Sequence, residues 1–316
     1  MYPYRALLEA LRSFGEEAKK THLMSALWYK DEEMESLTEN PGFTARKAYS
    51  NLSKTVDMMG KLHLDITNQD RYLLNGVDMH IRLVRSRDAF SLMSNKAEYK
   101  VEIEDASLYI RRAKINPAVQ LGHIKGLELT SAKYPIQRVD VKAYTLSAGS
   151  RSFVQENLLF GQVPCRVVLG LVDNAAYNGH IEKNPFHFKH HKLNHLALYL
   201  DGQQVASKAL TPNFANNINV RSYCQLFIGT GKYFNDEDND LTRSNYVNGH
   251  TLFAFDMTPD LSGDSDVFNL VKQGNLRVEL SFAEELQNSV NLVVYAEFNN
   301  IIEIDRNRNV FVDYRA

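Results

Sequence analysis

The 316-residue chain has only two cysteines and lacks any long hydrophobic run. Cys165 and Cys224 each lie in an apolar, strand-like stretch, so we expect buried free thiols rather than a disulfide, which fits a reducing compartment. No run reaches the ~18 apolar residues of a membrane-spanning helix. The first residues also lack the basic and apolar regions of a signal peptide. We therefore expect a protein that is neither secreted nor inserted in a membrane.

The chain also lacks an excess of one charge. It has 36 Lys and Arg against 38 Asp and Glu, for a formal net charge of −2, and both halves are close to neutral. Proteins that bind nucleic acid or membrane surfaces usually present a basic face. We therefore expect neither sequence-specific nucleic acid nor membrane among the partners.

Motifs of phosphate binding and nucleophilic catalysis are missing as well. Gly-Thr-Gly-Lys at residues 229–232 resembles a phosphate loop, but Leu226 and Tyr233 stand where such a loop needs Gly and Ser or Thr. No serine lies in a Gly-x-Ser-x-Gly turn, and neither cysteine has a neighbouring histidine. Glu284 and Glu285 follow a predicted strand, where a solvated turn explains them. We predict no enzyme activity, no catalytic residues and no cofactor.

Four histidines, His187, His190, His191 and His195, are close together in the sequence and raise the question of a metal site. On a helix three of them would align. Pro185 and a strand predicted from about residue 193 argue against a helix, and a strand would scatter the side chains over both faces. We therefore interpret them as a surface or loop cluster and predict no metal ligands.

Asp236, Asp238 and Asp240 look like the start of a calcium-binding loop. Such a loop also needs Gly at its sixth position and Glu at its twelfth, and Leu241 and Val247 stand there instead. The acidic run is therefore interpreted as the solvated tip of a long polar loop.

The first half of the chain contains one helix pattern and about four strand patterns. Leu7, Leu11, Phe14 and Ala18 recur at helical spacing, which predicts an amphipathic helix. Residues 77–83 alternate between apolar and polar side chains, as in a strand with one buried face. The other extended candidates are residues 55–66, 100–104 and 107–115.

The second half is richer in strand patterns. In residues 184–205, an aromatic segment is followed by an alternating strand, an Asp-Gly turn and a second short strand, which indicates a β-hairpin. Residues 276–282 alternate without a break, so one face of this strand is predicted to be buried. The eight strand candidates are residues 139–146, 165–172, 193–200, 203–209, 220–228, 251–256, 276–282 and 292–298, the last extended by 301–304. The predicted interior includes Val278, Leu280, Leu292 and Val294.

These patterns predict an all-β fold made of two antiparallel β-sandwiches with short helices. We place the boundary between residues 125 and 135, so that residues 1–128 hold the N-terminal helix and residues 129–316 hold the eight strands of a jelly roll. Four strands are half of what a jelly roll needs. The first sandwich is therefore expected to be incomplete, with open sheet edges that favour aggregation or a borrowed strand.

Five motifs carry a resemblance to a known family: Asp70-Arg-Tyr-Leu-Leu-Asn-Gly-Val-Asp78, Asn184-Pro-Phe-His-Phe188, Phe253-Ala-Phe-Asp-Met-Thr-Pro-Asp260, Gln273-Gly-Asn-Leu276 and Val294-Tyr-Ala-Glu-Phe298. Over nearly its whole length the chain resembles the double jelly-roll major capsid proteins of Polinton (Maverick) transposons and adintoviruses. More distantly, it is similar to capsid proteins of large double-stranded DNA viruses. The resemblance implies two jelly rolls in one chain and a structural role without catalytic residues.

The resemblance also implies partners and a location. Capsid proteins of this family assemble as trimers that tile a lattice, so we expect a homotrimer, with a minor capsid protein as a further partner, in the virion or in the host nucleus or cytoplasm. Family members carry a further N-terminal segment that supplies the first strands of the first jelly roll. The chain is therefore expected to be N-terminally truncated, through a degraded or domesticated gene copy or an incomplete gene model.

Two alternatives to an assembling capsid subunit stay open. Jelly rolls also serve as lectin and cupin domains, so a binding module is one alternative. A cupin needs strand-borne metal ligands, which the histidine cluster supplies poorly, and lectins are usually secreted. The other alternative is a domesticated derivative that no longer assembles.

Overall fold

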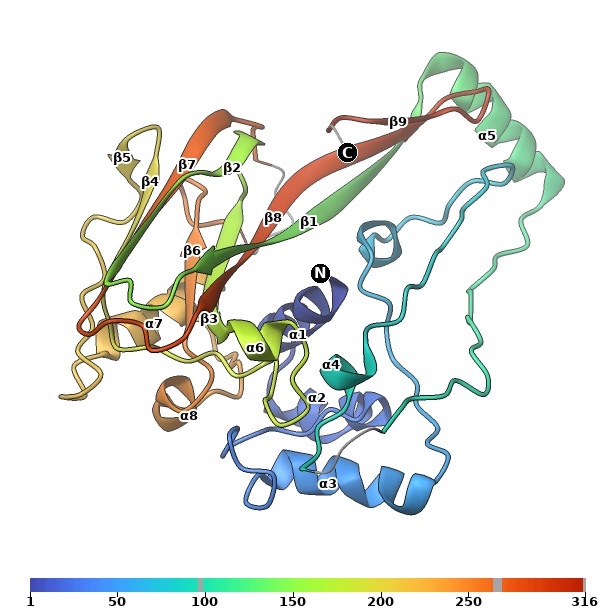
Figure 1. Ribbon diagram of the computed structural model, residues 1–316. Coiled ribbons are helices and arrows are strands. Elements are labelled where there is room, and N and C mark those ends of the chain that lie inside the picture. Colours follow the sequence, from blue (N-terminus) through green and yellow to red (C-terminus); the bar gives the residue numbers. More distant parts are fainter. Residues whose placement is uncertain (96–98, 264–268, 315–316) are drawn as a thin grey trace.

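The computed structural model describes residues 1–95, 99–263 and 269–314, and every strand in these residues lies after residue 131. The helices are α1 (Tyr2–Ser13), α2 (Glu16–Lys20), α3 (Pro41–Ser50), α4 (Asp88–Ser91), α5 (Pro117–Leu129), α6 (Asn174–Tyr177), α7 (Val220–Gly229) and α8 (Arg243–Val247), with 3-10 helices η1 (His22–Ala26), η2 (Asn51–Ser53) and η3 (Asp65–Asn68). The strands are β1 (Ala132–Leu146), β2 (Ser152–Gln162), β3 (Arg166–Asp173), β4 (Leu193–Leu200), β5 (Gln203–Gln204), β6 (Leu252–Asp256), β7 (Gln273–Phe282), β8 (Val290–Ile304) and β9 (Val310–Val312). Figure 1 shows the strands gathered in a sandwich and a mostly irregular N-terminal part beside it.

The strands form two antiparallel sheets in the orders β1-β8-β3-β6 and β2-β7-β4-β5, and β9 pairs with the end of β8. Four pairs are nested in the sequence, namely β1 with β8, β2 with β7, β3 with β6, and β4 with β5. The pairs β3–β8 and β4–β7 join them into two sheets of four strands. This nested pairing is that of a jelly roll. The prediction of antiparallel sheets packed as a sandwich is confirmed.

The core lies between the two sheets; β7 buries alternate side chains, whereas β3 and the first part of β8 are buried at consecutive positions. Val278 and Leu280 of β7 and Leu292 and Val294 of β8, all predicted to lie inside, are at most 1% exposed. The predicted strand at 276–282 and its buried face are thus confirmed, and residues 301–304 do extend the last long strand.

The helices α1 and α7 pack on the sheet that contains β8, α1 against β1 and α7 against β6. A buried ionic network ties α1 to this sheet. The carboxylate of Glu297 accepts a hydrogen bond from Arg166 Nη1 at 2.8 Å and lies 3.1 Å from Arg12 Nε of α1. Tyr295 donates its hydroxyl to the same carboxylate at 2.6 Å. The predicted N-terminal helix therefore packs on the sandwich of the second half, and it ends at Ser13, before the predicted Ala18.

The four strands predicted before residue 128 do not form, and this prediction is wrong. In the described residues before β1 no segment is paired in a sheet. Residues 77–83 form neither a helix nor a strand, because a strand requires a neighbouring chain to pair with. The candidate strand 107–115 is followed by α5, which begins at Pro117 and whose first turn is capped by Asn116 Oδ1 accepting from Ala118 N at 2.9 Å. The division into domains at 128 stays a prediction.

Two strand predictions in the second half are also wrong, one of them only in part. Residues 220–228 form α7, because their apolar side chains recur at three and four residues, the helical spacing. Of the predicted strand 203–209, only Gln203–Gln204 forms strand β5, and Val205 N donates to Leu198 O at 2.9 Å, so this prediction is right at its start alone. Conversely, β2 escaped prediction, since its alternation is interrupted by a register shift between Gln155 and Leu159.

Candidate functional site

The first candidate site is an extended part of the chain that lacks a sheet partner. We call residues 72–87 and 99–116 the arm. It contains an Asn75-Gly76 turn, with Gly76 at φ +82°, of the kind that closes β-hairpins. In Figure 1 the arm runs beside the sandwich and leads up to α5.

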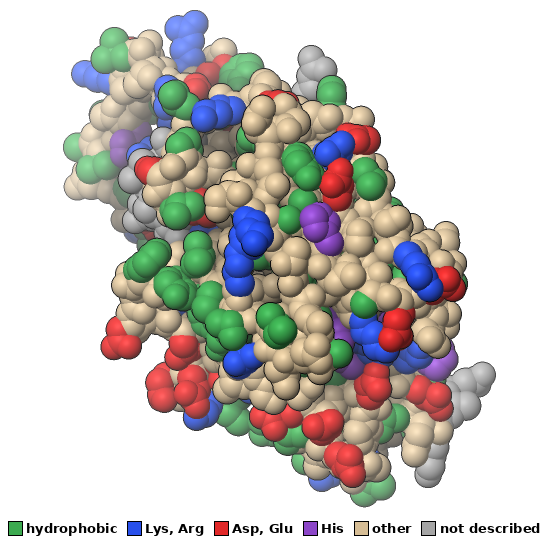
Figure 2. Space-filling model, turned by 90° about the vertical axis from the view of Figure 1, so that its left-hand side faces the viewer, with side chains coloured by type: hydrophobic (Ala, Val, Ile, Leu, Met, Phe, Trp, Pro, Cys, Tyr) green, Lys and Arg blue, Asp and Glu red, His purple; other side chains and the backbone are tan. Residues whose placement is uncertain are grey.

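Large apolar side chains are exposed all along the arm. They are Tyr72 (56% exposed), Met79 (45%), Leu83 (69%), Val84 (77%), Tyr99 (54%), Ile103 (61%), Leu108 (51%), Tyr109 (81%) and Ile110 (69%). Single exposed apolar residues are common on protein surfaces, but a dense series marks an interaction site or an aggregation liability. Figure 2 views the molecule from the β4 and β5 side, opposite the arm, and there hydrophobic side chains lie in small groups between charged ones.

The backbone of the arm is unpaired over most of its length. Within the described chain, residues 77–86 and 102–115 take part in no backbone–backbone hydrogen bond. A few side chains anchor the arm: Tyr134 donates its hydroxyl to Tyr72 O at 3.1 Å, and Asp88 accepts from Val101 N at 3.0 Å. The arm therefore presents open N–H and C=O groups next to apolar side chains, which is the template for adding strands.

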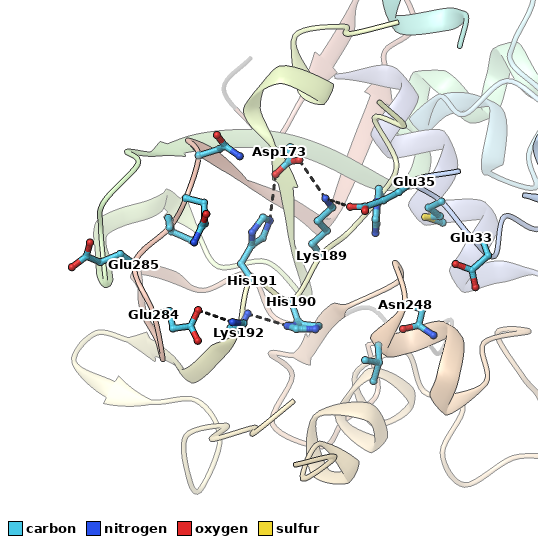
Figure 3. A pocket seen from close by; sticks show the side chains of 16 residues that line it. Glu33, Glu35, Asp173, Lys189, His190, His191, Lys192, Asn248, Glu284 and Glu285 are labelled. Atoms are coloured by element: carbon cyan, nitrogen blue, oxygen red, sulfur yellow. Dashed lines mark hydrogen bonds and ion pairs between the residues drawn. The ribbon is translucent and has the colours of Figure 1, made fainter. Parts of the chain in front are cut away.

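The second candidate site is a pocket of about 690 Å³ that contains three of the four predicted histidines. His187, His190 and His191 line it, while His195 lies on β4 outside it. The segment after β3 and the turn after β7 form the walls, together with residues 33–35 of the N-terminal part. Figure 3 shows the charged side chains that point into this space.

Ion pairs already engage the charged groups of the pocket (Figure 3). Lys189 Nζ pairs with Glu35 and lies 3.5 Å from Asp173 Oδ2. Lys183 Nζ lies 3.4 Å from the same oxygen, and Lys192 pairs with Glu284 at 2.6 Å. Burial alone would raise the pKa of Asp173, but Lys189, His191 and Lys183 hold it below its ordinary value. Most of the charged groups that line the pocket are thus already paired.

Burial governs the histidines of this region. It lowers the pKa of His187 to about 4 and that of His191 to about 4, so both rings are neutral at pH 7. Burial also lowers the pKa of His190, which stacks on Phe214 at 4.2 Å between ring centroids. In residues 1–95, 99–263 and 269–314, no group of three or more His, Cys, Asp or Glu side chains is arranged to hold a metal ion.

None of the described helices has the length and hydrophobicity needed to cross a bilayer.

The acidic run is exposed at Asp236 and Asp238, as the predicted solvated tip requires, but it also contacts the N-terminal part of the chain. Asp240 Oδ1 pairs with Lys30 Nζ at 2.8 Å, and Asp238 Oδ1 accepts from Glu16 N at 3.1 Å. Lys19, buried to 4% exposure, donates to Asn239 O at 2.6 Å. These partners lie more than 200 residues away in the sequence, so no local pattern could have revealed the contact.

The other predicted site residues have local structural roles. Lys232, at the end of the failed phosphate-loop motif, donates to Asp238 O at 3.0 Å and stabilises the same loop. Glu284 and Glu285 form exposed ion pairs, the latter with Arg151 at 3.3 Å. Cys165 and Cys224 are both free thiols, and burial raises the pKa of Cys165 to about 12.

No protein-family model matches the chain. An uncharacterized protein of Caenorhabditis elegans, F54H12.2, is 27% identical over 99% of this chain and 75% of its own length. Its name assigns it no function.

Several virus capsid structures have a similar fold over part of the chain. The PBCV-1 capsid matches 59% of this chain with 9% identity and a TM-score of 0.36, and the Sputnik virophage matches 58% with 13% identity and a TM-score of 0.37. The mavirus major capsid protein matches 58% with 10% identity and a TM-score of 0.31. The match spans 52%, 39% and 41% of these three chains, respectively. At this level of similarity the matches do not establish a function.

Proposed function

We propose that the protein is a self-assembling structural subunit of the capsid type, of the kind encoded by Polinton (Maverick) elements and adintoviruses, and that it has no catalytic role. The observation that carries the proposal is the arm. A jelly-roll sandwich stands beside segments whose apolar side chains are exposed and whose backbone, over residues 77–86 and 102–115, has no backbone hydrogen-bond partner in the described chain.

The arm supports assembly for energetic reasons. Each of its large apolar side chains contributes roughly 1.5–3 kcal/mol when fully buried. Its open backbone groups can be paired in the same step, because strands from another polypeptide add to a free edge. Burial and pairing on this scale favour association over a free arm.

The fold alone does not distinguish this function from its alternatives, since jelly rolls also occur in lectins and cupins. A cupin holds a metal through side chains on its strands, and the described residues offer no such cluster. Four charged groups of the pocket, Lys189, Lys192, Glu35 and Asp173, already pair with one another or with neighbours, although His191 Nε2 is buried there without a hydrogen-bond partner among the described residues. These features favour a structural subunit over a binding module.

The finer proposal concerns the assembled state. Residues 1–128 would contribute to a first jelly roll once further strands pair with the arm, and residues 129–316 would form the second. Two jelly rolls in each chain and three chains in each tile would give a trimeric capsomer, with a minor capsid protein as a further partner. Its place would then be the virion, or the nucleus or cytoplasm of a host cell.

The test is the association state of the full chain, measured by sedimentation velocity over a wide range of concentrations. The arm variant is Leu83→Asp combined with Tyr109→Asp, which places two charges among exposed apolar groups (69% and 81% exposed). The control is Phe234→Asp, which changes an equally exposed aromatic residue (82%) outside the arm. We expect the wild type and the control to associate and the arm variant to remain monomeric with unchanged thermal stability.

Two outcomes would contradict the proposal. A wild-type chain that stays monomeric at every concentration would favour a binding module or a non-assembling derivative. Association of the arm variant to the same extent as the wild type would show that the arm is not the contact surface.

A further inference from the structure

An irregular strap, residues 28–40, lies across the loops at one end of the jelly roll. It has no helix or strand of its own and is held by side chains. Met34 is 4% exposed and packs at Gly249, where its Sδ lies only 2.7 Å from the position that a Cβ would take. Glu35 pairs with Lys189, and Lys30 pairs with Asp240. The strap therefore depends on a few specific contacts.

Two partly buried histidines, His187 and His191, line the same pocket as the Glu35 end of the strap. His187 Nδ1 lies 3.9 Å from Glu35 Oε1, and Lys189, Asp173 and His250 also face this ring. His191 Nε2 lies 3.8 Å from Asp173 Oδ1, and its other charged neighbours are Lys189 and His190. Their side chains are 14% and 15% exposed.

A third buried histidine, His250, lies near the middle of the strap. Its residue is 7% exposed, and its Nδ1 atom has no hydrogen-bond partner among the described residues. The groups that face it are Asp31 and Lys30 of the strap, Lys19 of α2 and the ring of His187. Lys30 is already paired with Asp240 and Asp31 with Arg46, so a proton on this ring would add a positive charge that no free carboxylate among these groups compensates.

The charges around the Glu35 end balance only while the histidines are neutral. Glu35 and Asp173 face Lys189 and Lys183, so two negative groups meet two positive ones. Protons on His187 and His191 would leave two positive charges uncompensated in a desolvated site, which is costly. Release of the strap removes that cost by returning the rings to water.

We propose that the strap is an acid-released latch, in which protonation of His187, His191 and His250 frees residues 28–40 from the jelly roll while the jelly roll itself stays folded. The proposal goes beyond self-assembly and does not depend on it. Acid would thereby uncover the loops that the strap now shields.

Linkage gives the direction and the pH window. Burial lowers the pKa of each of the three rings to about 4, against an ordinary value of about 6.5 for a released ring. The released state therefore binds more protons between these values, so acid favours it. Between pH 7 and pH 5 the ratio of released to closed strap rises roughly twentyfold for each histidine. The pKa of Glu35 is lowered by its bond to Lys189, so its contribution is lost at still lower pH, in the same direction.

The single tryptophan makes the test direct. Trp28 is the only one in the chain, stands at the start of the strap, is partly buried against the core, and has Lys19 Nζ at 5.6 Å from its ring centroid. We expect its fluorescence to shift to longer wavelength between pH 6.5 and pH 4, while the far-ultraviolet circular dichroism of the β-sandwich stays unchanged.

Substitutions distinguish protonation of the three histidines from other effects of acid. The triple variant His187→Gln, His191→Gln and His250→Gln should lose the transition in this window, while His123→Gln, on the exposed face of α5, should keep it. Glu35→Gln alters a side chain that is 70% exposed and leaves the buried rings intact. It removes one compensating charge, so its transition should move to higher pH.

Three results would overturn the latch. One is a Trp28 signal that does not change between pH 7 and pH 4. A second is a fluorescence transition that coincides with loss of the dichroism signal, which would indicate global unfolding. The third is a midpoint that neither the triple variant nor Glu35→Gln moves.

Discussion

Residues 77–83 and residues 276–282 have the same pattern of alternating apolar and polar side chains, but only the second set forms a strand. β7 lies between β2 and β4 and buries Val278 and Leu280 almost completely. In the arm, Met79 and Leu83 are exposed, and the backbone of residues 77–83 has no partner in the described chain. Alternation therefore indicates which side of a strand faces inward, whereas the strand itself exists only where neighbours are available.

The largest expected effect comes from a charge in the closed sandwich. Leu280→Asp places a carboxylate at a position that is 1% exposed, with no partner for it, and should lower the free energy of unfolding by at least about 4 kcal/mol. Leu83→Asp makes the same change at the equivalent place of the alternation in the arm, at 69% exposure, and should alter stability by less than about 0.5 kcal/mol. Urea unfolding measures the free energy of unfolding of both variants. Equal losses of stability would contradict the difference between the sandwich and the arm.

The next effect tests whether α1 belongs to the sandwich. Glu297→Gln removes the charge that balances Arg166, both of which are fully buried, and weakens the link to Arg12 of α1. Breaking a buried pair of this kind should cost about 3 kcal/mol. Glu102→Gln, in the arm with a side chain that is 80% exposed, is the matched control and should be close to neutral. A loss below about 1 kcal/mol for Glu297→Gln would mean that the network contributes little to stability.

The smallest expected effect compares two glycines. A Cβ on Gly229 would meet Ala254 O at 2.3 Å, so Gly229→Ala should destabilise the fold by about 2 kcal/mol through a forced shift of α7 on β6. A Cβ on Gly126 of α5 would meet nothing within 4 Å. Gly126→Ala should therefore leave stability unchanged or raise it by up to about 1 kcal/mol through better helix propensity. Thermal unfolding measures the stability of both variants. An increase in stability for Gly229→Ala would contradict the close packing of α7.

Much of the sandwich could be predicted because its strands carry their own signals. The strands at 139–146, 193–200 and 276–282 alternate clearly, and they are found as β1, β4 and β7. The helix α7 was missed although its apolar residues recur at helical spacing, because its aromatic and β-branched residues also favour strands. The four strands predicted in the first half fail to form for a different reason. Whether a segment has a neighbouring strand to pair with is not determined by its local sequence.

For the candidate sites, too, the sequence identifies some of the residues but not their partners. The histidines after residue 186 stand out in the sequence, but Glu35, which pairs with Lys189, is about 150 residues away and has no distinguishing motif. The acidic run has obvious residues as well, yet its partners Lys19 and Lys30 lie in the N-terminal part. Sequence reveals which side chains are unusual, whereas their partners depend on the tertiary fold.

Hydrogen exchange along the chain, compared between monomer and assembly, tests the central claim most directly. The account predicts strong protection of β3, β7 and β8 in both states, because these strands are paired within the sandwich. Residues 77–86 and 102–115 should exchange freely in the monomer and become protected in the assembly. An assembly in which these residues still exchange freely, or a monomer in which they are already protected, would contradict it.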